Sequence, residues 1–447
     1  MAHHQIEVAE EHYVFKPETR KKLIILLIVG IAVFALGLVL AMSGGGHEEA
    51  KHEGGHASAV VAKELVASTQ HEAAAAESHG AEAGHHAETA SWLKRIYTTL
   101  WMNNVFFTGL GIIGLFFVAI QYAAQAGWSV GVKRIGMAMA TWIPIAGILM
   151  LGLYFLTHHD IFHWTHSSLY HEGEGFDPII NKKAPFFFWP LAGGTFPVFF
   201  LGRMVLFFAV WYWFFTMIRK NMRAEDLENS TKWWHKNQVL STVFLIFFGI
   251  SSSVAAWDWV MSIDTHWFST MFGWYVFASW WVTGLATITL ITVNLKSAGY
   301  LKIVNANHIH DLGKFVFAFS IFWTYIWFSQ FLLIYYANIP EETVYFLERM
   351  KNSPYSWIFF LNLILNFVLP FLLLMTRDAK RQISMLKVVC PIIIVGHWFD
   401  FFNMVTPGVM KFDGGVGFME IGMALIFAAV YLFVVLTSLT KLPLFGK

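Results

Sequence analysis

Ten runs of 18 or more mostly apolar residues divide this chain of 447 residues. A run of about 20 apolar residues crosses a hydrocarbon core of about 30 Å as a helix, which satisfies its own backbone hydrogen bonds. The sequence therefore predicts an all-α integral membrane protein with ten transmembrane helices. They are expected at residues 23–42, 105–126, 135–156, 196–218, 239–257, 271–295, 315–336, 357–375, 385–402 and 421–439.

The positive charges predict the orientation of these helices. With the N-terminus inside, the inner segments hold 19 Lys and Arg residues and the outer segments hold 9. Inner segments of membrane proteins are enriched in Lys and Arg, so both termini are expected in the cytoplasm. A net charge of +1 and the lack of a long basic tract give no indication of a nucleic-acid partner.

The expected organisation has five parts. Residues 1–22 are a cytoplasmic segment, 23–42 a first anchor, 43–100 a periplasmic connector, 101–439 a nine-helix body and 440–447 a cytoplasmic tail. A polar segment precedes the first helix, and its apolar stretch is longer than a signal-peptide core, which favours a retained anchor. The connector is rich in Ala, Glu and His, with seven histidines between His47 and His86. It is a solvated linker or, alternatively, a collector of Zn or Cu.

The single cysteine, Cys390, limits the redox chemistry of the chain. One thiol cannot build a disulfide, an iron–sulfur cluster, a Cys-based zinc site or a covalent haem within the chain. Haem b is not expected either, because His397 is the only deep histidine. In the outer loop after the third predicted helix, His163 and His166 have metal-like spacing but lack a second pair, so no metal site is predicted and the loop is interpreted as a docking surface.

Arg203 is the most unusual charge within an apolar run. It lies about seven residues into the fourth predicted helix, roughly 10 Å below the outer surface. Burying a cation in lipid is costly, so Arg203 is expected to hold a titrating carboxylate or to polarise a bound carbonyl. The alternatives are a side chain that extends to the surface, or a static buried ion pair.

The ninth predicted helix carries His397 and Asp400 near its outer end. A spacing of three places both on one helix face. A histidine beside a carboxylate is suited to accept and pass on a proton, whereas the alternative is a structural hydrogen bond. Asp400 is also a candidate counter-ion for Arg203.

The joint between the fifth and sixth helices is dense in acids and aromatics and contains no Lys or Arg. Such a joint is suited to a flat quinone ring between aromatic walls, or it is a packed belt loop whose polar residues cap the next helix. The candidate quinone-binding residues are Trp257, Asp258, Asp264, His266 and Trp267.

The seventh predicted helix carries a row of polar residues that predicts a proton path starting at its cytoplasmic end. Polar rows of this kind hold water or simply join helices by hydrogen bonds. The residues of this row are Asp311, Lys314, Ser320, Thr324, Tyr325 and Gln330, with Asn362, Asn366, Thr283 and Thr287 as similar rows on neighbouring helices.

Three runs carry a resemblance to a known family. Residues 257–275, 310–314 and 327–342 resemble the NrfD-like (polysulfide-reductase membrane-subunit) proteins of alternative complex III, and the similarity covers the nine-helix body. The resemblance implies ten helices, with two four-helix bundles flanked by the first and last helices. It also implies the inner membrane of a bacterium, with bound phospholipid.

The resemblance further implies a function in a respiratory complex that oxidises membrane quinol, often menaquinol. Electrons would pass through iron–sulfur and c-type haem subunits to a cytochrome c or a haem-copper terminal oxidase, because this chain has no haem or iron–sulfur centre of its own. His397, Asp400 and Arg203 would then act in quinol oxidation and proton transfer. The alternative is a proton-conducting half-channel or a docking subunit, with quinol oxidised only in the NrfD-like sister subunit.

Overall fold

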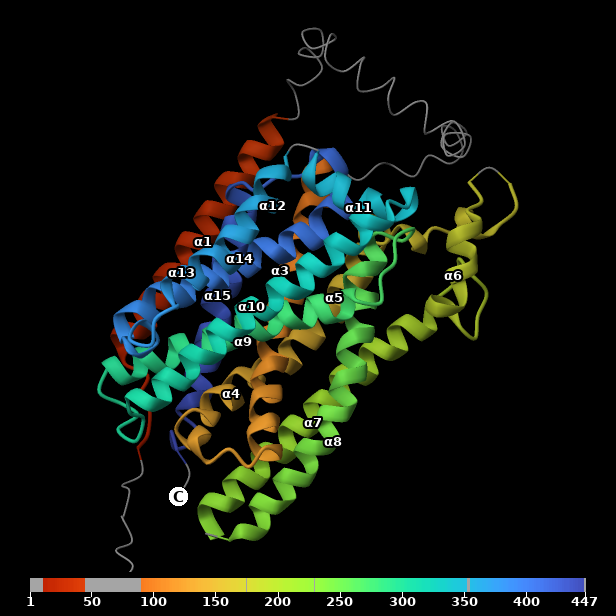
Figure 1. Ribbon diagram of the computed structural model, residues 1–447. Coiled ribbons are helices and arrows are strands. Elements are labelled where there is room, and N and C mark those ends of the chain that lie inside the picture. Colours follow the sequence, from red (N-terminus) through yellow and green to blue (C-terminus); the bar gives the residue numbers. More distant parts are fainter. Residues whose placement is uncertain (1–10, 45–89, 174, 229, 352–353, 446–447) are drawn as a thin grey trace, which may run out of the picture.

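The computed structural model describes the chain except for residues 1–10, 45–89, 174, 229, 352–353 and 446–447 (Figure 1). Ten of its helices are long and apolar enough to cross a membrane, which confirms the predicted all-α ten-helix membrane fold. The described residues contain no β-strand. The histidine-rich part of the predicted connector lies outside the described residues.

The crossing helices overlap all ten predicted positions. They are α1 (Pro17–Gly44), α3 (Ser91–Ala123), α4 (Lys133–Met139) continuing into α5 (Ile143–Ile161), α7 (Val198–Glu228), α8 (Thr231–Trp259), α9 (Phe272–Ser297), α10 (Ala306–Ala337), α12 (Ser356–Leu363) continuing into α13 (Leu369–Leu373), α14 (Ile383–Met410) and α15 (Phe418–Leu439). A π-helical turn, Ile364–Val368, joins α12 to α13.

Several helices are longer than their apolar runs. Helix α3 begins at Ser91 although its apolar run starts near residue 105, and α7 continues to Glu228 although its run ends near 218. The extra turns carry polar side chains with partners inside the protein, such as Arg95 with Glu420. Hydropathy therefore locates the part of a helix in lipid but not its ends.

The helices form two groups with a flanking pair. Helices α3, α5, α7 and α8 pack together, as do α9, α10, α12–α13 and α14, while α1 packs mainly against α15 (Figure 1). Helices α3 and α9 are the most enclosed of the ten. Helices α1 and α15 approach each other closely at two glycines. A Cβ on Gly37 would lie 2.3 Å from the backbone of Met419, and a Cβ on Gly422 would lie equally close to the backbone of Phe34. Small residues permit such backbone approach between membrane helices.

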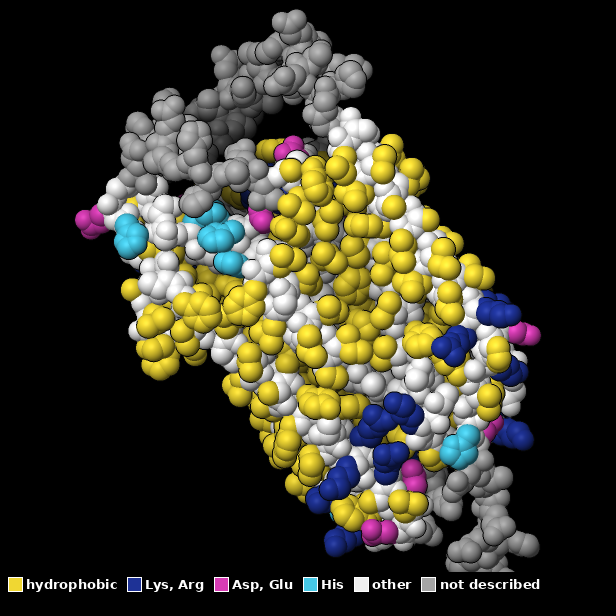
Figure 2. Space-filling view, turned by 180° about the vertical axis from the view of Figure 1, so that it is seen from behind, with side chains coloured by type: hydrophobic (Ala, Val, Ile, Leu, Met, Phe, Trp, Pro, Cys, Tyr) yellow, Lys and Arg dark blue, Asp and Glu magenta, His cyan; other side chains and the backbone are white. Residues whose placement is uncertain are grey.

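Two short helices at the predicted outer end were not expected from the sequence. Helix α6 (Pro178–Phe188) lies against α7, and α11 (Pro340–Met350) lies against α10, α12 and α14. Both begin with proline, which is favoured in the first turn of a helix. A broad hydrophobic band covers the face shown in Figure 2, and Lys and Arg side chains gather toward one end of it. This distribution is the one expected of a lipid-embedded protein.

Candidate functional site

Asp400 is a buried carboxylate within the group formed by α9, α10, α12–α13 and α14, which we call the second helix group. It is 0% exposed, and each of its hydrogen-bond donors comes from a different helix. Trp323 Nε1 of α10 donates to it at 3.0 Å, Asn362 Nδ2 of α12 donates at 2.7 Å, and the Tyr275 hydroxyl of α9 also donates. A buried carboxylate needs such donors because charge is costly in a low-dielectric interior. We call Tyr275, Trp323, Asn362, His397 and Asp400 the carboxylate cluster.

His397 lies one helical turn before Asp400 and faces the same way, as the spacing predicts. Its Nδ1 atom is 3.7 Å from Asp400 Oδ2 and 2.9 Å from the Ser279 hydroxyl. Its Nε2 atom is buried and has no protein partner. The imidazole therefore has one nitrogen beside the carboxylate and a second, buried nitrogen without a hydrogen bond to the protein.

A polar row continues from the carboxylate cluster along α12 into the π-helical turn. The Asn366 amide donates to Asn362, and the Asn366 Oδ1 atom is buried without a partner. Asn366 lies in the π-helical turn, and Gly396 faces it at a distance where a Cβ would be 2.3 Å from Oδ1. The Ser320 hydroxyl of α10 is also buried without a partner. This row thus combines an irregular helix turn with hydrogen-bonding capacity for water.

On the predicted outer side, Arg349 of α11 closes the helix group. Its side chain is 1% exposed and pairs with Asp264 at 2.9 Å. It also donates to the backbone oxygens of Asn403 at 2.7 Å and Tyr345 at 2.8 Å. Burial alone would lower the pKa of Arg349, but the neighbouring Tyr345 and Asp264 raise that pKa above its ordinary value. Arg349 is therefore a fixed positive charge.

A cavity of about 10 Å³ connects these two features. Tyr275, Gln330, Arg349 and Asn403 are among the residues that line it. Its volume suits about one water molecule and is far too small for a quinone ring. The cavity places one potential water between Tyr275, which contacts Asp400, and Arg349, which contacts Asp264.

Arg203 pairs with Asp258 of α8 and not with Asp400. Arg203 Nε is 2.8 Å from one carboxylate oxygen of Asp258, and Nη2 is 2.7 Å from the other. The guanidinium also lies 4.2 Å from the centroid of the Phe186 ring and 4.3 Å from that of Phe199. The proposed Arg203–Asp400 pair is therefore wrong, because α7 packs against α8 whereas α14 belongs to the other group. The geometry is that of a buried ion pair.

The predicted quinone-binding residues are Trp257, Asp258, Asp264, His266 and Trp267, and four of them have partners in the structure. Asp258 pairs with Arg203, Asp264 with Arg349, and His266 with Asp177. The Trp267 indole donates to the Glu342 backbone and stacks on Tyr345 with ring centroids 4.1 Å apart, while Trp257 Nε1 is buried without a partner. Burial alone would raise the pKa of Asp177, but hydrogen bonds from the Ile180 backbone and His266 lower it below its ordinary value. Asp264 and Trp267 thus share the neighbourhood of Arg349 and Tyr345, whereas Asp258 and His266 belong to separate ion pairs.

The predicted proton row on α10 is divided between two faces. Ser320 and Gln330 are buried toward the helix group, and the Thr324 hydroxyl donates to the Ser320 backbone at 2.9 Å. Asp311 and Lys314 form an exposed ion pair at 2.7 Å. Tyr325 is 67% exposed and points away from the bundle, because five residues advance a helix by about 500° and so turn its side chain away from Ser320.

Three residues of this region were not predicted. Tyr275 and Trp323 contact Asp400, and Arg349 seals the outer end. Trp323 shares a face with Ser320 at a spacing of three, which is a usable signal. Tyr275 and Arg349 gave no such signal, because one resembles a belt aromatic and the other a soluble loop cation.

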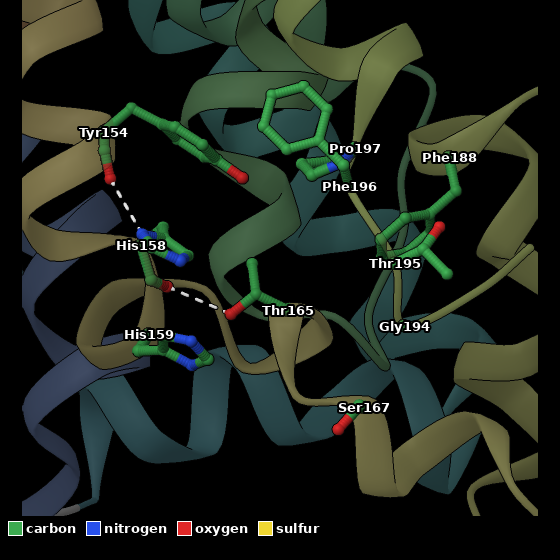
Figure 3. Close-up of a pocket in the computed structure, with 10 residues that line it drawn as sticks. All are labelled: Tyr154, His158, His159, Thr165, Ser167, Phe188, Gly194, Thr195, Phe196 and Pro197. Atoms are coloured by element: carbon green, nitrogen blue, oxygen red, sulfur yellow. Dashed lines mark hydrogen bonds between the residues drawn. The ribbon is translucent and has the colours of Figure 1, made fainter. Parts of the chain in front are cut away.

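A larger cavity lies at the predicted outer end of the group formed by α3, α5, α7 and α8. It measures about 360 Å³ and lies between the end of α5, the loop after it and the start of α7 (Figure 3). The Tyr154 hydroxyl points into it, is buried and has no partner. His158 Nδ1 lies 3.2 Å from the Tyr154 backbone oxygen, which orients the imidazole. The lining comprises Tyr154, His158, His159, Thr165, Ser167, Phe188, Gly194, Thr195, Phe196 and Pro197.

This larger cavity belongs to the loop between α5 and α7, which was interpreted from the sequence as a docking surface. Burial lowers the pKa of His163, and His166 and His266 lower it further, so this imidazole is neutral near pH 7. Within the described part of the chain, no group of three His, Cys, Asp or Glu side chains is arranged to hold a metal ion.

Comparison with known proteins adds no assignment to this geometry. Neither models of known protein families nor the curated proteins include a match for the sequence.

Proposed function

We propose that the chain is a proton-transferring membrane subunit of a quinol:cytochrome c or quinol:terminal-oxidase complex of the alternative complex III type. Its counterpart there is the smaller of the two NrfD-like membrane subunits. Motif resemblance supports the family, and the fully buried Asp400 with donors from three helices carries the assignment of proton transfer. In this proposal the chain is embedded in the inner membrane of a bacterium, and its partners supply all redox metals.

The carboxylate cluster is suited to receive and release one proton. Three donors hold the Asp400 carboxylate, and a protonated Asp400 can donate its own O–H to the Tyr275 oxygen, so the cluster accommodates both forms. His397 is the nearest base, and a proton taken up at its Nε2 atom would allow the Nδ1 proton to pass to Asp400 Oδ2, which lies 3.7 Å away, so that the imidazole is neutral again after the transfer. The proton that leaves Asp400 would pass by the Tyr275 hydroxyl and one water to Asp264 beside Arg349.

Asp264, whose side chain is 11% exposed, is the acceptor at the outer end of this route. The fixed charge of Arg349 raises the barrier for a proton from either side and so limits leakage along the route. On the inner side, Asn366 and Ser320 lead toward Asp311 and Lys314. Along α10, Asp311 is about 9 residues or roughly 13 Å from Ser320, and Lys314 is about 6 residues or roughly 9 Å from it.

The test uses the whole complex in proteoliposomes, with release of protons measured during quinol oxidation. The wild type should release more protons per electron than quinol oxidation itself supplies. Replacing His397 by Gln should reduce the excess by about 100-fold in rate, the low end of general acid–base effects. Tyr325→Phe is the matched control, because Tyr325 faces away from the bundle. Unchanged proton release in His397→Gln would remove the proposal.

A second candidate function is binding of a quinol ring in the 360 Å³ outer cavity, because that volume and its aromatic walls suit a flat ring. The Tyr154 hydroxyl and His158 would then face the ring oxygens. This location differs from the predicted residues Asp258, Asp264 and His266.

Tyr154→Phe tests this second candidate. Loss of one hydrogen bond of about 1 kcal/mol should weaken binding by about fivefold. The measurement is labelling of the complex by an azido-quinone, followed by mapping of the labelled peptide. Tyr335→Phe, at an exposed tyrosine of α10, should change nothing. Label placed outside residues 154–197, or equal labelling in Tyr154→Phe, would contradict this site.

A further inference from the structure

Five cations gather where α7 and α8 meet on the inner side of the protein. They are Arg219, Lys220, Arg223, Lys232 and Lys236, and we call them the basic hairpin. All except the half-buried Arg219 are exposed. The inner segments hold most of the Lys and Arg residues, so this end is cytoplasmic by the positive-inside rule.

None of these five cations has a carboxylate partner among the described residues. The acids of the same hairpin are engaged elsewhere. Asp226 binds Arg134 of α4 at 2.6 Å, Glu225 accepts from Tyr122 of α3 at 3.1 Å, and Glu228 accepts from Trp233 at 2.6 Å. Because Asp226 and Glu225 face into the protein, the basic hairpin presents a net positive charge outward, with Glu228 as its one exposed acid.

Exposed apolar side chains lie on the same helices as these cations, farther from the α7–α8 turn. Trp213 is 49% exposed and precedes Lys220 by seven residues, which places both on one face about 10 Å apart along the axis. On α8, the exposed Val239 and Val243 follow Lys236 at helical spacing. Each helix therefore presents apolar surface and then cations, in the order of acyl chain and headgroup in the inner leaflet.

Aromatic rings fix part of the basic hairpin. Lys232 and Lys236 both lie over the Trp233 ring, with Nζ atoms 5.7 and 5.1 Å from its centroid. The Arg219 guanidinium lies 5.6 Å from the Phe215 ring. Such cation–π contacts hold ammonium and guanidinium groups at the membrane surface without neutralising their charge.

We infer that the basic hairpin binds the phosphate of an anionic phospholipid of the cytoplasmic leaflet, such as phosphatidylglycerol. Clustered Lys and Arg next to a membrane helix attract anionic headgroups, and a guanidinium can bind phosphate through two parallel hydrogen bonds. This inference rests on orientation and charge and is independent of the proposed proton transfer.

The test measures which lipid stays with the purified complex. The complex is equilibrated in mixed micelles of equal dioleoyl-phosphatidylglycerol and dioleoyl-phosphatidylcholine, and retained lipids are counted by mass spectrometry. We expect phosphatidylglycerol to be enriched, and Arg219→Gln with Arg223→Gln to lower the enrichment about tenfold or more. Lys232→Gln with Lys236→Gln is a second variant on the other helix, with the same expected direction.

The control removes the same charge from another exposed inner segment. Lys21→Gln with Lys22→Gln on α1 should leave the enrichment unchanged. Equal enrichment in the wild type and both hairpin variants would overturn the inference. An equal loss of enrichment in the α1 control would also overturn it, because total charge would then determine the enrichment. Loss of a soluble acidic subunit from the hairpin variants, with their lipid retained, would overturn it as well.

Discussion

Replacing Asp400 by Asn is expected to abolish proton transfer through this chain. Asparagine keeps the size of the side chain, and its carbonyl oxygen can accept from Tyr275 and Asn362, but its NH2 group cannot accept from Trp323 and it cannot carry a proton. The rate of proton release beyond that of quinol oxidation should fall by at least about 100-fold. The measurement is proton release in proteoliposomes containing the whole complex.

A matched change separates loss of proton transfer from loss of charge. Asp413→Asn removes a carboxylate from an exposed turn at the end of the same helix and should have no effect. The melting temperature of each variant complex shows whether it is folded. A folded Asp400→Asn complex with wild-type proton release would show that the carboxylate cluster is structural.

Breaking the Arg203–Asp258 pair should have the largest effect on stability. Asp258→Ala would leave a guanidinium that is about nine-tenths buried without its carboxylate. Removing one partner of a buried pair costs about 3–5 kcal/mol, because the remaining charge is not compensated. The free energy of unfolding in mixed micelles should fall by about that amount.

The double replacement Arg203→Met with Asp258→Leu separates charge from packing. Apolar residues of similar volume often replace a buried ion pair at little cost, so the double variant should recover most of the lost stability. Full activity of the double variant would assign this pair to stability alone. If the double variant is as unstable as Asp258→Ala, cation–π packing of Arg203 against Phe186 and Phe199 carries the stabilisation.

Sequence patterns predicted the crossing helices because hydropathy over about 20 residues is a local property. They did not predict α6 or α11, which have 11 residues each and depend on contacts with longer helices. Isolated helices of that length are marginal in water, so their existence is decided by packing. The helix extensions beyond lipid have the same origin.

The candidate site was predictable only within single helices. Spacing placed His397 and Asp400 on one face, but it could not say which helices contact that face. Tyr275, Trp323 and Asn362 reach Asp400 from three other helices, and their alignment depends on the rotation of each helix in the bundle. The same limit explains why Asp400 was a candidate counter-ion for Arg203.

The most direct test of the account is infrared difference spectroscopy of the whole complex upon addition of quinol. Transfer of a proton to a buried carboxylate produces a carboxylic-acid carbonyl band. The account predicts such a band in the wild type and in Asp413→Asn, and its absence in Asp400→Asn. A spectrum of Asp400→Asn identical to that of the wild type would contradict proton transfer at Asp400.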